Sequence, residues 1–338
     1  MKLNTRRVSP HFLALAVVTA LTSFAFAYTM TATPKFSLPS GTYTGKQYVK
    51  LSDGTPGAVI HYTLDGSAPT TKSLVYTGPI TVSVSAVIES VAVAPGYANS
   101  GLARASYTIL RLSPYISPNA VQVTNIQTHT GWKIKYDPGT NGTATGSMAL
   151  VSSPSLSGEA ARFDTLFTYY GGILYSDTYG NDPDAMNFVY DSYVRIKTGS
   201  LIANLEMDNN QVAANGDTVI YAFQCAGSAG VWEFGENSGT PQNHKAHWLK
   251  STALCNPAKW TKDTWHHVQI SYSRDALGFV TYHSVWLDGA ESPINATVLG
   301  AFSLGWPVGH LIGNFQVDGT AKTGSSILYL DKYTIYRW

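Results

Sequence analysis

The chain has 338 residues, carries a formal net charge of +1, and only 13% of its residues are charged. This low, balanced charge provides no basic surface for nucleic acid and no polybasic patch for an anionic membrane, so we predict neither partner. The 21 tyrosines, 8 tryptophans and 30 glycines are typical of a β-rich extracellular protein with exposed aromatic residues. At this length we expect two domains with separate cores.

Residues 1–27 have the pattern of a secretory signal peptide. The pattern consists of three positive charges, an apolar run and a small-residue cleavage site, at Lys2, Arg6 and Arg7, then 12–21, then 25–27. The apolar run is shorter than the roughly 20 residues of a membrane-spanning helix. We therefore expect cleavage before Tyr28, no membrane insertion afterwards, and a periplasmic or secreted protein.

Residues 28–112 are predicted to form a small β-sandwich. Short runs of β-forming residues alternate with turn signals such as Asp53-Gly54 and Asp65-Gly66. The stretches 61–70 (HYTLDGSAPT), 76–80 (YTGPI) and 91–97 (VAVAPGY) resemble the immunoglobulin-like module at the C-terminus of chitobiases and β-hexosaminidases. The resemblance implies an accessory spacer of secreted carbohydrate-active proteins, in which Asp65 is a turn residue and no group is catalytic.

The second domain is predicted to span residues 113–338. Two Ser-Pro pairs, Ser113-Pro114 and Ser117-Pro118, stiffen a short connection, and the following residues show an all-β pattern without internal repeats. Both cysteines of the chain, Cys225 and Cys255, lie in this domain. An even pair in an oxidising compartment predicts one disulfide, with two buried free thiols as the alternative.

Three stretches of this domain alternate apolar and polar residues as half-buried strands do. In 205–211, Leu205 and Met207 share one face, and Glu206, Asp208 and Asn210 share the other. The stretches 265–273 and 310–318 likewise pair an apolar face with a face of amides and imidazoles, including His267, Gln269, Asn314 and Gln316. Amides and aromatic rings suit sugar hydroxyls and the apolar faces of pyranose rings, so these faces are the predicted ligand-binding residues.

The domain resembles the concanavalin A-like lectin/glucanase superfamily. The resemblance depends on the strand 265–270 (WHHVQI), the hairpin 285–289 (VWLDG) and the closing strand 328–331 (LYLD). It implies that the chain is an all-β protein, with the small immunoglobulin-like sandwich followed by a large concanavalin A-like jelly-roll sandwich.

The laminarinase-type hydrolases of that superfamily carry a strand motif Glu-x-Asp-x-(x)-Glu. The resemblance implies a nucleophile at Glu206 and an assisting acid at Asp208, while the position of the acid/base holds Asn210 or Gln211. An amide can neither protonate a leaving oxygen nor take a proton from water near neutral pH. The motif therefore favours a binding site, and enzymatic activity is left open.

Several alternatives stay open at this point. An acid for a hydrolase could come from Glu233, Glu236, Asp275 or Asp318, and a lyase could use His267 and Gln269 with Tyr221. Glu206 and Asp208 could also be no more than a solvated strand face. The tryptophans Trp232, Trp248, Trp260 and Trp306 could be sugar platforms or core residues.

No cofactor motif is found, and calcium is the one ion considered, with oxygens from 182–184 or 208–210. We predict a secreted polysaccharide-binding protein. A polysaccharide-degrading enzyme with a non-standard acid is the first alternative, and a structural or adhesive surface protein is the second.

Overall fold

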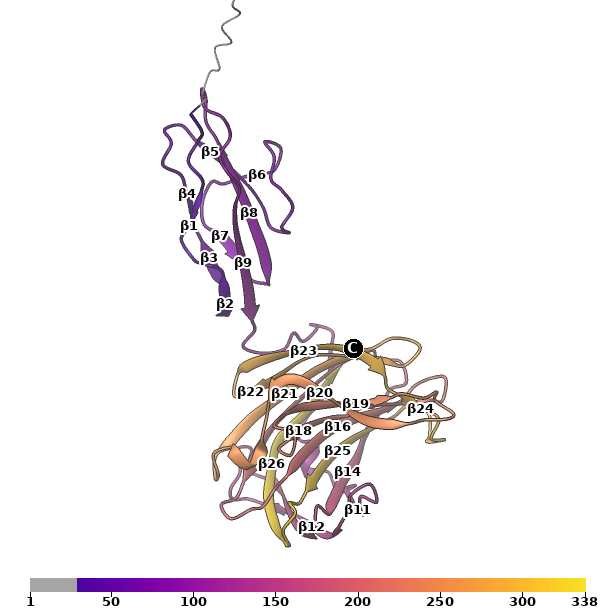
Figure 1. Ribbon diagram of the computed structural model, residues 1–338. Helices are drawn as coiled ribbons and strands as arrows, with labels where there is room; N and C mark the ends of the chain where they lie inside the picture. The colour runs from indigo at the N-terminus through magenta and orange to yellow at the C-terminus, as the bar shows by residue number, and fades with distance from the viewer. Residues whose placement is uncertain (1–28) are drawn as a thin grey trace, which may run out of the picture. The chain divides into compact units, whose positions relative to one another are not determined.

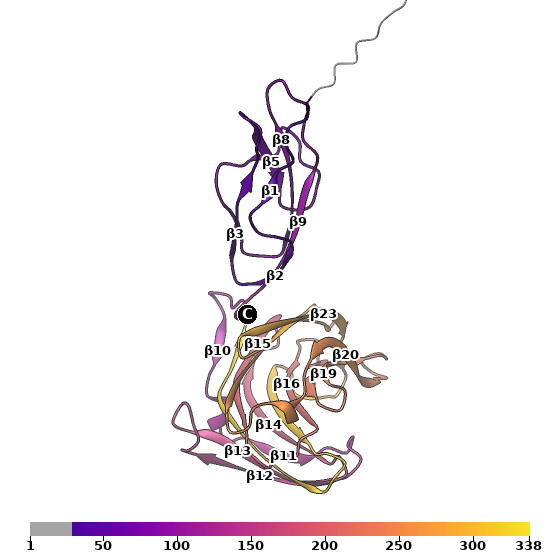
Figure 2. The same cartoon turned by 60° about the vertical axis from the view of Figure 1, so that its left-hand side comes forward.

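The computed structural model describes residues 29–338, so the predicted signal peptide lies outside the described residues. Within 29–338 almost every regular element is a strand, and the helices are two short 3-10 turns, η1 (Ile126–Thr128) and η2 (Pro257–Lys259). The described chain divides into two compact units (Figures 1 and 2): one made of 29–41, 48–82 and 86–107, the other of 42–47, 83–85 and 108–338. The predicted domain boundary at residue 113 stays a prediction.

Nine short strands between residues 35 and 110 form a β-sandwich, and most of their residues belong to the first unit. They are β1 (Lys35–Phe36), β2 (Gly41–Thr44), β3 (Gln47–Val49), β4 (Leu51–Ser52), β5 (Val59–Thr63), β6 (Leu74–Val75), β7 (Ile80–Val82), β8 (Ala86–Val93) and β9 (Ala103–Leu110). A five-stranded sheet has the order β2-β9-β8-β5-β6, and β1-β4 and β3-β7 form two-stranded sheets. Asp65 accepts hydrogen bonds from Ser67 in the turn after β5, which is the turn role predicted for it.

One sheet of the second unit has eight strands in the order β12-β13-β26-β15-β21-β22-β23, with β10 pairing with β26. We call it the outer sheet. Its strands are β10 (Val121–Val123), β12 (Thr143–Val151), β13 (Ala160–Thr168), β15 (Asn187–Ile196), β21 (Trp265–Arg274), β22 (Phe279–Leu287), β23 (Ala290–Leu299) and β26 (Gly324–Arg337).

The other sheet of this unit has nine strands in the order β11-β14-β25-β16-β18-β19-β20, with β17 pairing with β16 and β24. We call it the cavity sheet. Its strands are β11 (Lys133–Tyr136), β14 (Gly172–Asn181), β16 (Asn204–Val212), β17 (Thr218–Tyr221), β18 (Phe223–Ala226), β19 (Val231–Asn237), β20 (Ala246–Leu254), β24 (Ala301–Phe302) and β25 (His310–Asp318).

The core of the second unit lies between these two curved layers (Figure 2). The predicted alternation holds in three strands: Leu205 and Met207 of β16, Val268 and Ile270 of β21, and Phe315 of β25 all join the core and are at most 1% exposed. Because successive strand residues face opposite ways, burying one face of β16 against the outer sheet turns Glu206 and Asp208 away from that core. The all-β sandwich prediction is confirmed.

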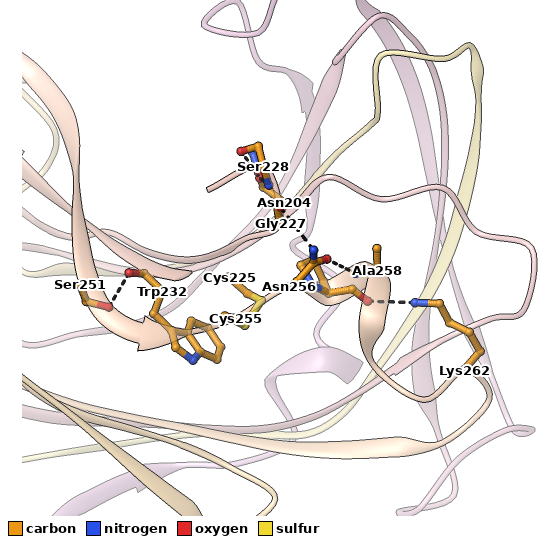
Figure 3. The surroundings of a disulfide bond; sticks show 11 residues. Asn204, Cys225, Gly227, Ser228, Trp232, Ser251, Cys255, Asn256, Ala258 and Lys262 are labelled. Carbon is orange, nitrogen blue, oxygen red and sulfur yellow. Dashed lines mark hydrogen bonds between the residues drawn. A yellow bond between two sulfur atoms is a disulfide. The ribbon is translucent and has the colours of Figure 1, made fainter. Parts of the chain in front are cut away.

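The predicted disulfide is present between Cys225 of β18 and Cys255, which follows β20. Figure 3 shows it beside Trp232, and the amide of Asn256 accepts a hydrogen bond from the Ala258 N–H to begin η2. The bond closes a sequence separation of 30 residues at the end of the cavity sheet. No helix among residues 29–338 is long and apolar enough to span a bilayer.

Candidate functional site

A cavity of about 250 Å³ lies on the face of the cavity sheet that points away from the core. We call it the central cavity. Polar residues of β16 and β25 line one part of it: Glu206, Asp208, Asn210 and Asn314. Mostly apolar and aromatic residues line the rest: Ile220, Ala222, Gly235, Glu236, Ala246, His247, Trp248, Phe302 and Trp306.

The two carboxyl groups of β16 form a coupled pair. Burial and the neighbouring Asp208 charge raise the pKa of Glu206 well above its usual range, and a hydrogen bond joins the two carboxyl groups. Burial raises the pKa of Asp208 to about 6, against the opposing effect of hydrogen bonds from Glu206, the Phe223 N–H (2.9 Å) and the Asn314 amide. Of the two groups, Glu206 therefore has the stronger tendency to hold a proton.

Asn210 occupies the third position of the hydrolase-type motif on the cavity side. It is 1% exposed and lines the central cavity, and its Oδ1 has no hydrogen-bond partner within the described part of the chain. A buried acceptor without a partner costs about 1 to 3 kcal/mol, which a ligand hydroxyl would offset.

Gln211, the other residue considered for that position, points into the core. Its Oε1 accepts from the Tyr221 hydroxyl (3.0 Å) and Arg274 Nε (2.7 Å), and its amide nitrogen donates to two backbone carbonyls. Strand alternation thus decides between the two candidates, because Gln211 is one residue out of phase with Glu206 and Asp208.

Strand β25 places two further predicted residues beside β16. In the antiparallel register Asn314 lies opposite Asp208 and Gln316 lies opposite Glu206, so all four side chains share one face. The Gln316 amide donates to Asp137 (2.9 Å) and Asp318 (3.0 Å). Burial raises the pKa of Asp318 to about 6, despite hydrogen bonds from Gln316 and Asn204 that lower it.

The prediction that His267 and Gln269 extend this face is wrong. Both belong to β21 of the outer sheet, which is not a neighbour of β16 or β25. They bind Asp191 of β15 instead, His267 Nε2 at 2.7 Å and Gln269 Nε2 at 2.7 Å from its two carboxylate oxygens, while Tyr193 stacks on the His267 ring at 4.3 Å. The apolar and polar residues of β21 do alternate as predicted, but alternation does not determine which sheet a strand joins.

The lyase set is not assembled either. Tyr221 is fully buried in the core and bonded to Gln211, while His267 and Gln269 lie in the outer sheet.

The candidate replacement acids are dispersed. Asp275 accepts the N–H groups of Leu277 and Phe279 in the turn between β21 and β22. Glu236 lines the central cavity and pairs with His247 (2.9 Å). Glu233 accepts from Gln224 (2.8 Å).

Of the four tryptophans considered as platforms, Trp248 and Trp306 line the central cavity. Trp232 and Trp260 are buried in the core, at 1% and 7% exposure. Sequence reasoning missed the apolar wall of the cavity, including Ile220 and Phe302, because their position depends on the pairing of β17 with β16 and β24.

Neither of the two runs considered for calcium has its side chains arranged around one point. Asn209 faces the core, where its amide oxygen binds the Tyr179 hydroxyl, so it cannot join Asp208 and Asn210. Asp182 binds Arg337 Nε (2.8 Å) and the backbone N–H groups of residues 184 and 185. Calcium binding stays an untested prediction.

The comparison with family models matches one part of the chain. Residues 38–104 match the chitobiase/β-hexosaminidase C-terminal domain, which confirms the resemblance predicted for that part of the chain. An endoglucanase from Clostridium saccharobutylicum is 51% identical over 43 residues, which are 13% of this chain and 10% of the endoglucanase.

Two solved structures illustrate the structural likeness. A carbohydrate-binding module of the β-sandwich superfamily gives a TM-score of 0.34 at 12% identity, over 89% of this chain and 97% of that chain. The β-glucanase of Bacillus licheniformis gives 0.31 at 11% identity, over 64% and 97%. At these scores the likeness supports no conclusion about function. The concanavalin A-like assignment of the second unit stays a prediction.

Proposed function

We propose that the second unit binds a polysaccharide in the central cavity. The observation that carries this proposal is the Asn210 side chain, which lines the cavity and whose buried Oδ1 has no partner among residues 29–338. Around it, the proton of Glu206, the oxygens of Asp208 and the amide of Asn314 are hydrogen-bonding groups of the kind that sugar hydroxyls match. Trp248 and Trp306 provide aromatic surface in the same cavity.

Other features of the chain support a role in carbohydrate binding outside the cell. Both sequence matches carry the names of enzymes that act on carbohydrates, a chitobiase/β-hexosaminidase and an endoglucanase. The disulfide between Cys225 and Cys255 is typical of proteins in an oxidising compartment. Together with the signal pattern in residues 1–27, these features support export.

A second candidate function is hydrolysis, and the raised pKa of Glu206 favours it. A protonated Glu206 and an ionised Asp208 would supply an acid and a carboxylate near neutral pH, above the raised pKa of Asp208 of about 6. However, the acid/base position of the strand motif on this face holds Asn210, and an amide cannot protonate a leaving oxygen. We therefore rank binding above hydrolysis.

The test scores retention and cleavage together. The full exported chain is incubated with β-glucans, chitin and alginate, and both the bound protein and the released reducing or unsaturated ends are measured. We expect retention without release, and a loss of at least tenfold in affinity for Asp208→Ala, because it removes a charged hydrogen-bonding partner.

His267→Ala is the matched control, since it removes a polar side chain from the outer sheet, and its retention should equal that of the parent. Equal retention by Asp208→Ala and the parent would contradict binding in this cavity. Release that Glu206→Gln abolishes would favour hydrolysis instead.

A further inference from the structure

A three-residue connection with two exposed tyrosines lies at one end of the second unit. Residues 169–171 carry the chain from β13 of the outer sheet to β14 of the cavity sheet. Tyr169 and Tyr170 are 58% and 37% exposed, and their rings pack edge to face at 5.2 Å. Both have positive φ, +34° and +65°, which is unfavourable for a bulky side chain and is usually left to Gly or Asn.

Close backbone packing holds the connection from two sides. The Tyr170 N–H donates to the Thr320 carbonyl (2.8 Å), and the Gly319 N–H donates to the Gly171 carbonyl (3.0 Å). On the other side, a Cβ on Gly142 would lie 1.7 Å from the Thr168 carbonyl oxygen. Surroundings of this kind can maintain a strained backbone, and strain kept together with exposed aromatic surface indicates a function for the two rings.

Tyr170 also lines a second cavity, of about 420 Å³, which we call the end cavity. Its other lining residues come from four further loops, at 201–203, 227–228, 256–258 and 320–322. Figure 3 shows four of them, Gly227, Ser228, Asn256 and Ala258, next to the disulfide, and the Asn256 amide donates to the Gly227 carbonyl (3.4 Å). The Cys225–Cys255 bond thereby fixes one wall of this cavity.

A continuous polar face connects the end cavity to the central cavity. Asn204 lies on the same face of β16 as Glu206, Asp208 and Asn210, and its amide oxygen accepts from the Ser228 hydroxyl (3.1 Å). Along a strand, the six residue steps from Asn204 to Asn210 span roughly 20 Å. A ligand long enough to contact both cavities would meet polar side chains for the whole distance.

We propose that the end cavity is a second glycan subsite, in which a sugar ring packs on Tyr170 and its neighbour Tyr169. Ser228, Thr320 and the exposed ammonium of Lys322 would serve its hydroxyl or acidic groups. An aromatic face combined with small apolar residues and scattered polar groups matches a pyranose ring. The inference rests on the proposed function of the central cavity, and extends it to a polymer chain that occupies both cavities.

The test compares polymers with short oligosaccharides. The pairs are laminarin with laminaritetraose, hydroxyethylcellulose with cellotetraose, and soluble chitosan with chitotetraose, each titrated against the full chain. We expect Tyr169→Asn/Tyr170→Asn to bind the retained polymer roughly tenfold more weakly, because two aromatic contacts are lost. Its affinity for the tetrasaccharide should be unchanged, and its melting temperature unchanged or higher, because Asn tolerates positive φ.

Each outcome separates this inference from the proposed function. Polymer binding that equals the parent's in the tyrosine variant, with binding lost in Asp208→Ala, overturns the end cavity alone. Polymer binding lost in the tyrosine variant but kept in Asp208→Ala supports the end cavity and overturns the central one. Loss of tetrasaccharide affinity in the tyrosine variant would show a general structural defect and overturn the inference, and a parent chain that binds none of the polymers overturns both.

Discussion

Two polar clusters of the second unit look alike in sequence and differ in their hydrogen bonds. On the outer sheet, both oxygens of Asp191 are taken by His267 and Gln269, and Tyr193 stacks on the His267 ring. On the cavity sheet, the pKa values of the half-buried Glu206 and the buried Asp208 are both raised, and a buried oxygen of Asn210 has no partner in the described chain.

The difference shows that residue types do not identify a binding site, whereas the state of their hydrogen bonds does. In the cluster on the outer sheet, both carboxylate oxygens of Asp191 have hydrogen-bond partners, and these bonds stabilise that sheet. In the cluster on the cavity sheet, a buried oxygen still lacks a hydrogen-bond partner. This lowers the stability of the folded state, and a bound ligand can offset the loss. Three experiments test this difference.

The largest expected effect concerns the disulfide, which fastens the cavity sheet. Replacing both cysteines, Cys225→Ala/Cys255→Ala, should lower the free energy of unfolding by about 3 to 4 kcal/mol, because the bond closes a 30-residue separation in the unfolded chain. Urea denaturation of both proteins measures it. A loss below about 1 kcal/mol would mean that the cavity sheet holds together without the covalent link.

The second experiment removes one carboxyl group from each cluster and compares the two variants. Asp191→Ala should lower stability by about 1 to 3 kcal/mol, because it leaves His267 and Gln269 without their acceptor, while glycan retention stays unchanged. Asp208→Ala should lower stability by a similar amount, because it leaves the Phe223 N–H and the Asn314 amide without their acceptor, but here retention falls. Thermal unfolding and affinity electrophoresis of the two variants read out both effects, and identical behaviour of the two would contradict the comparison.

The smallest effect is a dependence of stability on pH. The folded-state pKa values of Asp208 and Asp318 are raised to about 6 from an ordinary value of 3.8, so the folded state binds protons more tightly than the unfolded state. Their stabilising contribution is full below pH 4 and is lost as the pH rises to about 6. Asp318→Asn should flatten this fall by about 1 to 2 kcal/mol in denaturation measured between pH 4 and 7.

Asp263 offers the matched control for that titration. Its pKa is lowered by hydrogen bonds from Thr198, so Asp263→Asn should instead remove stability that is present above pH 4 and lost in acid. If Asp318→Asn leaves the dependence of stability on pH unchanged, the burial described for the Asp318 carboxyl group would be contradicted.

Local sequence patterns predicted faces well and sheet membership poorly. Alternation placed Leu205 and Met207 in the core and Glu206 and Asp208 outside it, because it follows from strand geometry alone. The same reasoning could not assign His267 to the outer sheet or Asn314 to the neighbour of Asp208, since long-range pairing depends on how the whole sandwich closes. The end cavity has no local signature, because five separate segments of the chain form it.

The alternation of β16 also limits how the site could change over evolutionary time. One inserted or deleted residue between Leu205 and Asp208 would exchange the two faces of the strand, moving carboxyl groups into the core and leucine or methionine into the cavity. Gradual change at this site can therefore proceed by substitution but not by a change of strand length. Asn210 is a position where one substitution, to Asp or Glu, would bring a third acid to the same face without altering the fold.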